Sequence, residues 1–174
     1  MDNVIIQVYR SPCGTLVLGS YGDRLCLCDW QCGRRHSNVS RRLARMLHAE
    51  FSEGISPVIG TAMSQLDEYF AGKRRVFDVP LLFTGTDFQT KVWNALVGIP
   101  FGSTISYGEM SRIIGMPNAV RAVANANGAN AISIFAPCHR VIGSDGSLTG
   151  YGGGLDAKAY LLNLEQGSVR STLF

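Results

Sequence analysis

The sequence predicts an α+β protein of two parts, in which a strand-rich beginning is followed by a mostly helical second half. Residues 3–32 alternate or run apolar between turn signals at 12–14 and 22–23, which indicates an antiparallel meander. Leucines at helical spacing predict two helices after it, over 40–54 and 56–72. With 46% hydrophobic residues in a chain of 174, there is enough apolar material to bury a core.

A connector over residues 73–88 separates the two parts. It contains Pro80 and Gly85 and has no helical period, so we expect a strand and a linking turn there. This places the boundary after Thr84 and predicts two domains, residues 1–84 and 85–174.

Three short helices are predicted after the boundary. The first covers 88–99 with a cap at Thr86 or Asp87, and the others cover 106–115 and 119–130. The last two, joined by a tight turn, have the helix-turn-helix pattern, which many helical hairpins share without binding DNA.

Small side chains at Ala119 and Ala122 surround a single basic residue, Arg121, on the second helix of this pair. Such a surface lets a helix approach a DNA backbone closely, although alanines also favour plain helix packing.

Composition indicates a soluble cytoplasmic protein. No apolar run approaches the roughly 20 residues of a membrane span, and the first ten residues do not have the pattern of a secretory signal. Five cysteines, an odd number, fit a reducing compartment. The net charge of +3 permits a nucleic-acid partner without requiring one.

Cys138 is the candidate nucleophile. It stands between Pro137 and His139, where the apolar stretch 132–136 gives way to a glycine-rich segment that can bend around a planar ligand. A free thiol is mostly protonated at neutral pH and needs a base, for which His139 is adjacent and Glu165 is a candidate orienting group. The alternative is that Cys138 ends a buried strand and that the residues after it only mark the surface.

Four motifs in this order, "SYGE", "RAVANANGAN", "PCHRVI" and "YGGGLDAK", resemble the O6-alkylguanine-DNA alkyltransferases over residues 87–165. The resemblance implies that Cys138 takes the alkyl group as a stable thioether, which consumes the protein. It also implies that His139 draws the thiol proton through a water with Glu165 behind it, that Asn130 braces the turn before the cysteine, and that Tyr107 donates a proton to the guanine oxygen.

The same resemblance implies a substrate pocket and a DNA surface. The carbonyls of Cys138 and Val141 would receive the exocyclic amine of the base, and Arg121 would enter the stack in place of the flipped nucleotide. The residues expected to line the substrate pocket are Pro137, Val141, Tyr151, Gly152, Gly153 and Lys158. Tyr151 and the glycines after it, including Gly154, would form a flexible wall over the alkyl group. The DNA-binding set is Arg121, Ala119, Ala122, Arg112 and Arg140, with Lys91 as a further phosphate contact.

The expected fold is an N-terminal ribonuclease-H-like α/β domain with antiparallel strands and a C-terminal winged-helix or helix-turn-helix domain. The expected partner is double-stranded DNA that contains O6-alkylguanine, and the substrate range, including O4-alkylthymine, is left open. No cofactor, metal, membrane or obligate protein partner is expected, and the protein is expected to be a monomer. Ala131 and Ser133 depart from the family, which often has proline there, so the strand before the cysteine should be less rigid.

Two rival functions remain: a protein that binds alkylated bases without transfer, and an unrelated thiol hydrolase. Relatives that bind without transfer do not have the acceptor cysteine, so Cys138 speaks against the first rival.

A zinc site is a separate alternative, because Cys26, Cys28, Cys32 and His36 follow the spacing C-x-C-x3-C-x3-H. The first two also fit core positions on one strand face.

Overall fold

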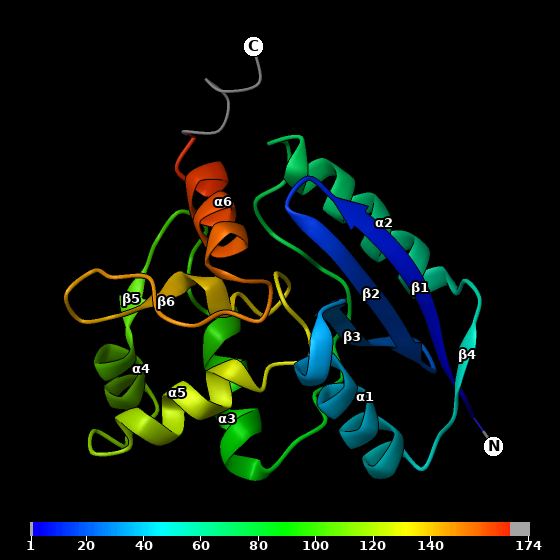
Figure 1. Cartoon of the computed structure of the whole chain (residues 1–174), viewed down its shortest axis with the longest axis horizontal. Coiled ribbons are helices and arrows are strands. Elements are labelled where there is room, and N and C mark those ends of the chain that lie inside the picture. The colour runs from blue at the N-terminus through cyan, green and yellow to red at the C-terminus, as the bar shows by residue number, and fades with distance from the viewer. Residues whose placement is uncertain (1, 168–174) are drawn as a thin grey trace.

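The first part of the chain is built on a four-stranded sheet, seen here in a computed structural model that describes residues 2–167 (Figure 1). Strands β1 (Val4–Ser11), β2 (Gly14–Tyr21) and β3 (Arg24–Trp30) form the predicted antiparallel meander. β4 (Phe51–Glu53) pairs with β1 in parallel, and the strand order is β3-β2-β1-β4. The sheet is therefore mixed and not purely antiparallel.

Helix α2 (Pro57–Phe70) matches the prediction for 56–72 and packs against β1, β2 and β3. Its first turn is capped by Ser56, whose hydroxyl accepts from the Ile59 amide at 3.2 Å. The apolar side of the helix, with Ile59, Leu66 and Tyr69 fully or almost fully buried, closes the core of this half.

The helix predicted over 40–54 was wrong at both ends, because α1 runs from Gly33 to Leu47 and a strand follows. Its first turn has no side-chain cap, but Arg35 and His36 both pair with Asp29 on the preceding strand, which holds that turn in place. After the helix, the Val4 amide donates to the Glu50 carbonyl at 2.8 Å and draws the chain into the sheet. A tertiary partner therefore holds the start of α1, whereas its end is a local cap at His48, which has a φ of 49° and donates its amide to the Ala44 carbonyl.

The second part contains the three predicted helices, α3 (Asp87–Val97), α4 (Tyr107–Ile113) and α5 (Val120–Gly128), and then α6 (Leu155–Glu165). α5 packs against both α3 and α4. Thr86, one of the two expected caps, forms a reciprocal capping box with Gln89 at the start of α3. A small parallel pair, β5 (Ile105–Ser106) with β6 (Val141–Ile142), links the α4 end of this half to the residues after Cys138.

Two expected strands do not form. In the connector 73–88, one parallel bridge joins Leu81 to Leu25. The apolar stretch 132–136 is a series of turns, and Cys138 itself begins a 3₁₀ helix, η1 (Cys138–Arg140). Within the stretch Ile134 has a φ of 73°, a left-handed conformation that is strained for a β-branched residue.

The two halves share a core. The hydrophobic cluster around the sheet also contains apolar residues of 131–135 and the α6 residues Ala157, Leu161 and Leu164. A second cluster, formed by α3, α4, α5 and η1, contains Cys138. Because the turn before the cysteine packs on the N-terminal sheet, that sheet helps to position the site. Within residues 2–167, no helix is long and apolar enough to cross a membrane.

Candidate active site

Cys138 lies in the C-terminal core with only 4% of its surface exposed. Burial raises the pKa of its thiol above the ordinary 9.0, and the hydrogen bonds of Asn130 and Ser133 and the charges of Arg35 and Lys158 only partly oppose this. The sulfur is therefore protonated at neutral pH. A nucleophilic role requires a base that removes the proton during the reaction.

His139 has the arrangement of such a base. Its Nε2 donates to Oε1 of Glu165 at 2.7 Å, because an ionised carboxylate can only accept. Its Nδ1 then carries a lone pair, and this nitrogen is buried without a hydrogen-bond partner among residues 2–167. Burial lowers the pKa of His139 while the nearby carboxylate raises it, and the net shift is downward. The ring is therefore neutral at pH 7 and able to accept a proton.

Glu165 is held in its ionised form by several donors. Burial raises the pKa of this carboxyl, but the hydrogen bonds from His139 and Arg140 and the positive charge of the Arg140 guanidinium outweigh it and lower the pKa to about 2. Tyr69 from α2 donates to Oε1 at 2.9 Å, and the Gly102 amide donates to Oε2 at 3.3 Å. The N-terminal half thus contributes directly to the group that orients His139.

Arg140 corrects an expectation. Its guanidinium was expected to hold DNA phosphates, but Nε and Nη2 bind Glu165 at 2.9 and 2.8 Å, and Nη1 donates to the Ile99 carbonyl at 2.6 Å. With 5% of the residue exposed and each of its three nitrogens bonded inside the protein, the guanidinium is not presented to a phosphate. The structure gives Arg140 the task of holding the carboxylate.

These pKa shifts predict how stability changes with pH. Ionised Glu165 contributes stability that is complete above its unfolded pKa of 4.5 and is lost as the pH falls toward its folded pKa of about 2. Neutral His139 contributes stability above the unfolded value of 6.5 that begins to be lost below it, because the folded pKa is lowered. Urea titrations from pH 8 to pH 3 should show a first decline below about pH 6.5 and a second below about pH 4.5.

His139→Gln should remove the first of these declines and leave the second. A free energy of unfolding that stays constant or increases from pH 7 to pH 5.5 in the wild-type protein would contradict the neutral, buried imidazole.

Asn130 has the bracing geometry expected of it. Its Nδ2 donates to the Ala136 carbonyl at 2.9 Å, and its Oδ1 accepts from the Ile132 amide at 3.0 Å, so one side chain ties both ends of the turn before Cys138. The edge of β3 completes the brace, since Cys28 exchanges backbone hydrogen bonds with Ala131 and Ser133 at 2.8 Å each. The turn is therefore ordered without proline.

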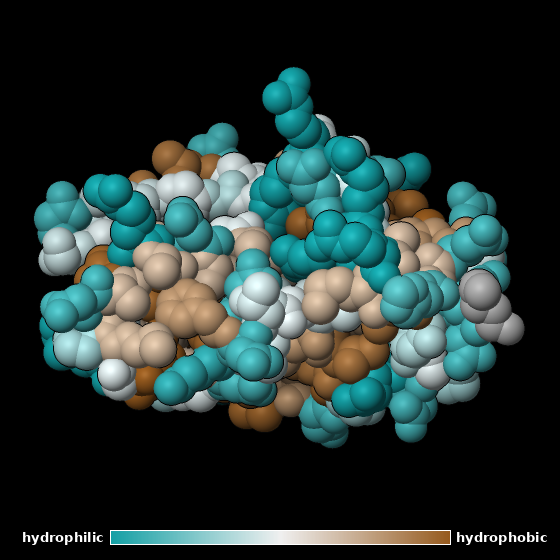
Figure 2. All heavy atoms as spheres, turned by 90° about the horizontal axis from the view of Figure 1, so that it is seen from below, coloured by the Kyte–Doolittle hydropathy of each residue, from teal (hydrophilic) through white to brown (hydrophobic). Residues whose placement is uncertain are grey.

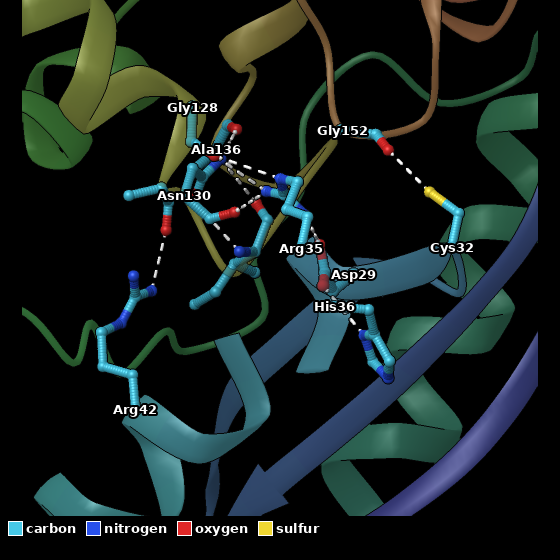
Figure 3. A network of polar contacts seen from close by, with 11 residues as sticks. Asp29, Cys32, Arg35, His36, Arg42, Gly128, Asn130, Ala136 and Gly152 are labelled. Carbon is cyan, nitrogen blue, oxygen red and sulfur yellow. Dashed lines mark hydrogen bonds and ion pairs between the residues drawn. The ribbon is translucent and has the colours of Figure 1, made fainter. Parts of the chain in front are cut away.

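A polar network, shown in Figure 3, connects β3 and α1 to the end of α5. Buried Asp29 pairs with Arg35 and with His36. The guanidinium of Arg35 also donates to the carbonyls of Gly128 and Asn130, the latter at 2.9 Å. This places a cation of the N-terminal half beside the residue that braces the active-site turn.

Sequence reasoning missed Asp29, Arg35 and Tyr69. One signal was available for the first: an acidic residue interrupts the otherwise apolar strand "LCLCDW", and a buried carboxylate needs a cationic partner. Arg35 and Tyr69 carry no sequence signal of their role, because each acts on a residue about 95 positions away in the chain.

The expected pocket residues lie around η1 and the 143–154 segment. Lys158, fully buried on α6, donates to the carbonyls of Val141 at 2.8 Å and Thr149 at 2.9 Å. The Tyr107 hydroxyl accepts from Thr149 at 3.1 Å. Pro137 is buried beside Cys138, and Tyr151 packs against both hydrophobic clusters.

The remaining DNA-binding candidates lie on the surface. Arg121, Ala122, Arg112 and Lys91 are exposed, and Ala119 at the start of α5 is half-buried. Figure 2 views the molecule from below, the side on which α5 and α1 lie in Figure 1, and hydrophilic side chains gather near the middle of that face.

The zinc alternative is not supported by the geometry. Cys26 and Cys28 are buried in the core, where burial raises the pKa of Cys26 to about 12 and that of Cys28 well above its usual value. Cys32 instead donates to the Gly152 carbonyl, and His36 binds Asp29. Across residues 2–167, no three His, Cys, Asp or Glu side chains form a group able to hold a metal ion.

Comparison with known families covers both halves of the chain. Residues 4–83 match the model of the ribonuclease-like domain of 6-O-methylguanine DNA methyltransferase, and residues 87–167 match the model of its DNA binding domain. The chain belongs to the 6-O-methylguanine DNA methyltransferase family.

Similar proteins of this family match the chain over nearly its full length. The methylated-DNA–protein-cysteine methyltransferase of Methanosarcina barkeri is 55% identical over 94% of this chain and 98% of its own. The methylated-DNA–protein-cysteine methyltransferase of Mycobacterium leprae is 44% identical over 94% of this chain and 93% of its own. A crystal structure of Mycobacterium tuberculosis OGT in complex with DNA superposes with a TM-score of 0.80 at 43% identity, over 94% of each chain. The two-domain α+β methyltransferase fold is thus confirmed.

Proposed function

We propose that this methyltransferase repairs DNA by moving the alkyl group of O6-alkylguanine onto Cys138, where it remains as a thioether. The observation that carries the proposal is the 2.7 Å hydrogen bond from His139 to Glu165 beside a buried, protonated cysteine. It leaves Nδ1 of His139, which has no hydrogen-bond partner among the residues that the structure describes, as a proton acceptor. Methyl transfer involving 6-O-methylguanine DNA and a protein cysteine is also the activity in the names of the family models and relatives described above.

The reaction follows from the protonation states. His139 takes the thiol proton at Nδ1, directly or through a water, and the resulting imidazolium is stabilised by Glu165. The thiolate attacks the alkyl carbon in line, a sulfur–carbon bond forms, and the carbon–oxygen bond to guanine breaks. The bonding pair remains on the guanine oxygen, which takes a proton from the Tyr107 hydroxyl, so that it does not leave as a free anion.

The pocket residues act on the guanine and the alkyl group. The carbonyls of Cys138 and Val141 receive the exocyclic amine. The Cys138 carbonyl also accepts from the Val141 amide and from Asn127, and the Val141 carbonyl also accepts from Lys158. Pro137, Tyr151, Gly152 and Gly153 form the wall near the alkyl group.

A duplex stacks its bases out of reach of any thiol, so the damaged nucleotide must rotate out. We infer that α4 and α5 form a helix-turn-helix pair of winged-helix type, with α5 against the DNA. Exposed Arg121 fills the space of the flipped base, Ala119 and Ala122 allow close approach, and Arg112 and Lys91 contact phosphates.

Mass spectrometry after incubation with a duplex that contains O6-methylguanine tests the function. A methyl group in place of hydrogen adds about 14 Da to the Cys138 peptide, once per molecule. Cys138→Ala should bind the same duplex and show no gain. Turnover without a mass gain would favour a thiol hydrolase, and binding without any change in the wild-type protein would favour a non-transferring reader of alkylated bases.

We further infer a monomer with domains at residues 1–84 and 85–174, located in the cytoplasm. All five cysteines are free, which fits a reducing compartment.

A further inference from the structure

The buried thiol raises the question of how a base reaches it. Cys138 is 4% exposed, so a planar purine cannot contact the sulfur until something moves. Tyr151 packs against the hydrophobic cluster that contains Cys138. Burial raises the pKa of this tyrosine, and the nearby Cys138 raises it further. Tyr151 and the glycines after it, residues 151–153, are here called the covering segment.

The covering segment rests on the N-terminal half. The Tyr151 ring meets the Trp30 ring edge-on, with centroids 5.8 Å apart. The Cys32 thiol donates to the Gly152 carbonyl at 2.9 Å, as Figure 3 shows. Trp30 ends β3 and Cys32 precedes α1, so both contacts come from one short stretch of the other domain.

The glycines allow this close approach. A Cβ at Gly152 would lie 2.6 Å from Cζ of Arg35, and a Cβ at Gly153 would lie 2.6 Å from Cδ2 of Trp30. A larger residue at Gly153 would therefore push the covering segment off the Trp30 ring, whereas one at Gly152 would displace either the segment or the end of the Arg35 side chain. These glycines serve the fit between domains as well as the flexibility of the segment.

The closed arrangement satisfies two buried polar groups poorly. Trp30 Nε1 and Tyr151 Oη are both buried, and neither completes a hydrogen bond of normal geometry within residues 2–167, although Trp30 and Ser133 lie close enough to the Tyr151 hydroxyl to lower its pKa against the effect of burial. Opening would give both atoms access to water, which offsets part of the apolar contact that is lost. The contacts that hold the closed state are therefore few: the edge-on ring contact and one thiol hydrogen bond.

We propose that Trp30 and Cys32 are positioning residues that hold the covering segment closed over Cys138. Through them the N-terminal domain sets how often the thiol is accessible and how much room the wall leaves for the O6-alkyl group. The inference rests on the proposed role of Cys138 as the acceptor.

Iodoacetamide labelling of Cys138, read by mass at its own peptide in the absence of DNA, measures how often the segment opens. Cys32→Ala removes one contact with little change in volume, and Trp30→Leu removes the ring contact. Each should raise the labelling rate about fivefold, because the rate follows the open population. Phe51→Leu, on β4 at the opposite edge of the sheet, is the matched control and should leave the rate unchanged.

A second measurement reports on the pocket. With duplexes that carry O6-benzylguanine or O6-methylguanine, the benzyl-to-methyl ratio of transfer rates should rise about threefold in Trp30→Leu, because a looser wall admits the larger group. A merely structural role would lower both rates together.

The outcomes are distinct. If Trp30→Leu does not fold, Cys32→Ala decides alone. Labelling within a factor of about two of the wild-type rate in every variant that folds would overturn the proposal. Failure of the proposed function would instead appear as no alkyl gain in the wild-type protein, a result that does not depend on labelling.

Discussion

Arg140→Ala is expected to lower the free energy of unfolding by about 3–5 kcal/mol, because it leaves the buried carboxylate of Glu165 without its main cationic partner. The guanidinium makes three contacts with that carboxylate, at 3.2, 2.9 and 2.8 Å, and one with the Ile99 carbonyl. Removing the guanidinium leaves the negative charge of Glu165 unpaired in the interior, because only 7% of this residue is exposed. Urea denaturation at neutral pH measures the loss.

Two further variants serve as controls for Arg140→Ala. Arg112→Ala, at an exposed position on α4, should change stability by no more than about 0.5 kcal/mol. Arg140→Lys keeps the charge without the planar fork, so an intermediate loss is expected, and it replaces the alanine variant if that does not fold. If Arg140→Ala were as stable as the wild-type protein but bound DNA with a weaker salt dependence, the interior role would be wrong and the phosphate role correct.

His139→Gln is expected to slow alkyl transfer by about 10²–10⁴-fold, the usual contribution of a general base. The buried thiol, whose pKa is raised above 9.0, then has to lose its proton to solvent. The pH profile should also change in form. Because the pKa of His139 is lowered in the folded protein, the wild-type rate should stay flat down through about pH 6.5 and fall only at lower pH, where Nδ1 is protonated, whereas the variant rate should keep rising up to and beyond about pH 9. Single-turnover kinetics with excess methylated duplex give both quantities.

His48→Asn is the matched control for that experiment. His48 is an exposed residue with a left-handed backbone at the end of α1, a conformation that asparagine tolerates. Its rate and pH profile should match those of the wild-type protein. A His139→Gln variant that transfers at the wild-type rate would remove the imidazole from the mechanism.

Patterns of local origin were predicted well. The meander β1–β3 follows from alternation between turn signals, and α3 begins at a cap that the sequence already indicated, Thr86. The errors lie where distant partners override local preference. The 132–136 stretch reads as a strand, but Asn130 and the edge of β3 satisfy its backbone groups in a turn. The start of α1 was missed because its anchor is a buried carboxylate on the strand before it.

By itself the sequence determined the chemical parts: a cysteine next to a histidine, a later glutamate, a glycine-rich segment, and motifs specific enough to predict the family and the two-domain fold. Only the tertiary structure decided which residues these groups contact. Arg140 turns inward to Glu165, Tyr69 joins it from the other domain, and Trp30 and Cys32 hold the segment over the thiol. The physical reason is that ionisation and access depend on burial and on partners brought together from far along the chain, which periodicity and spacing do not encode.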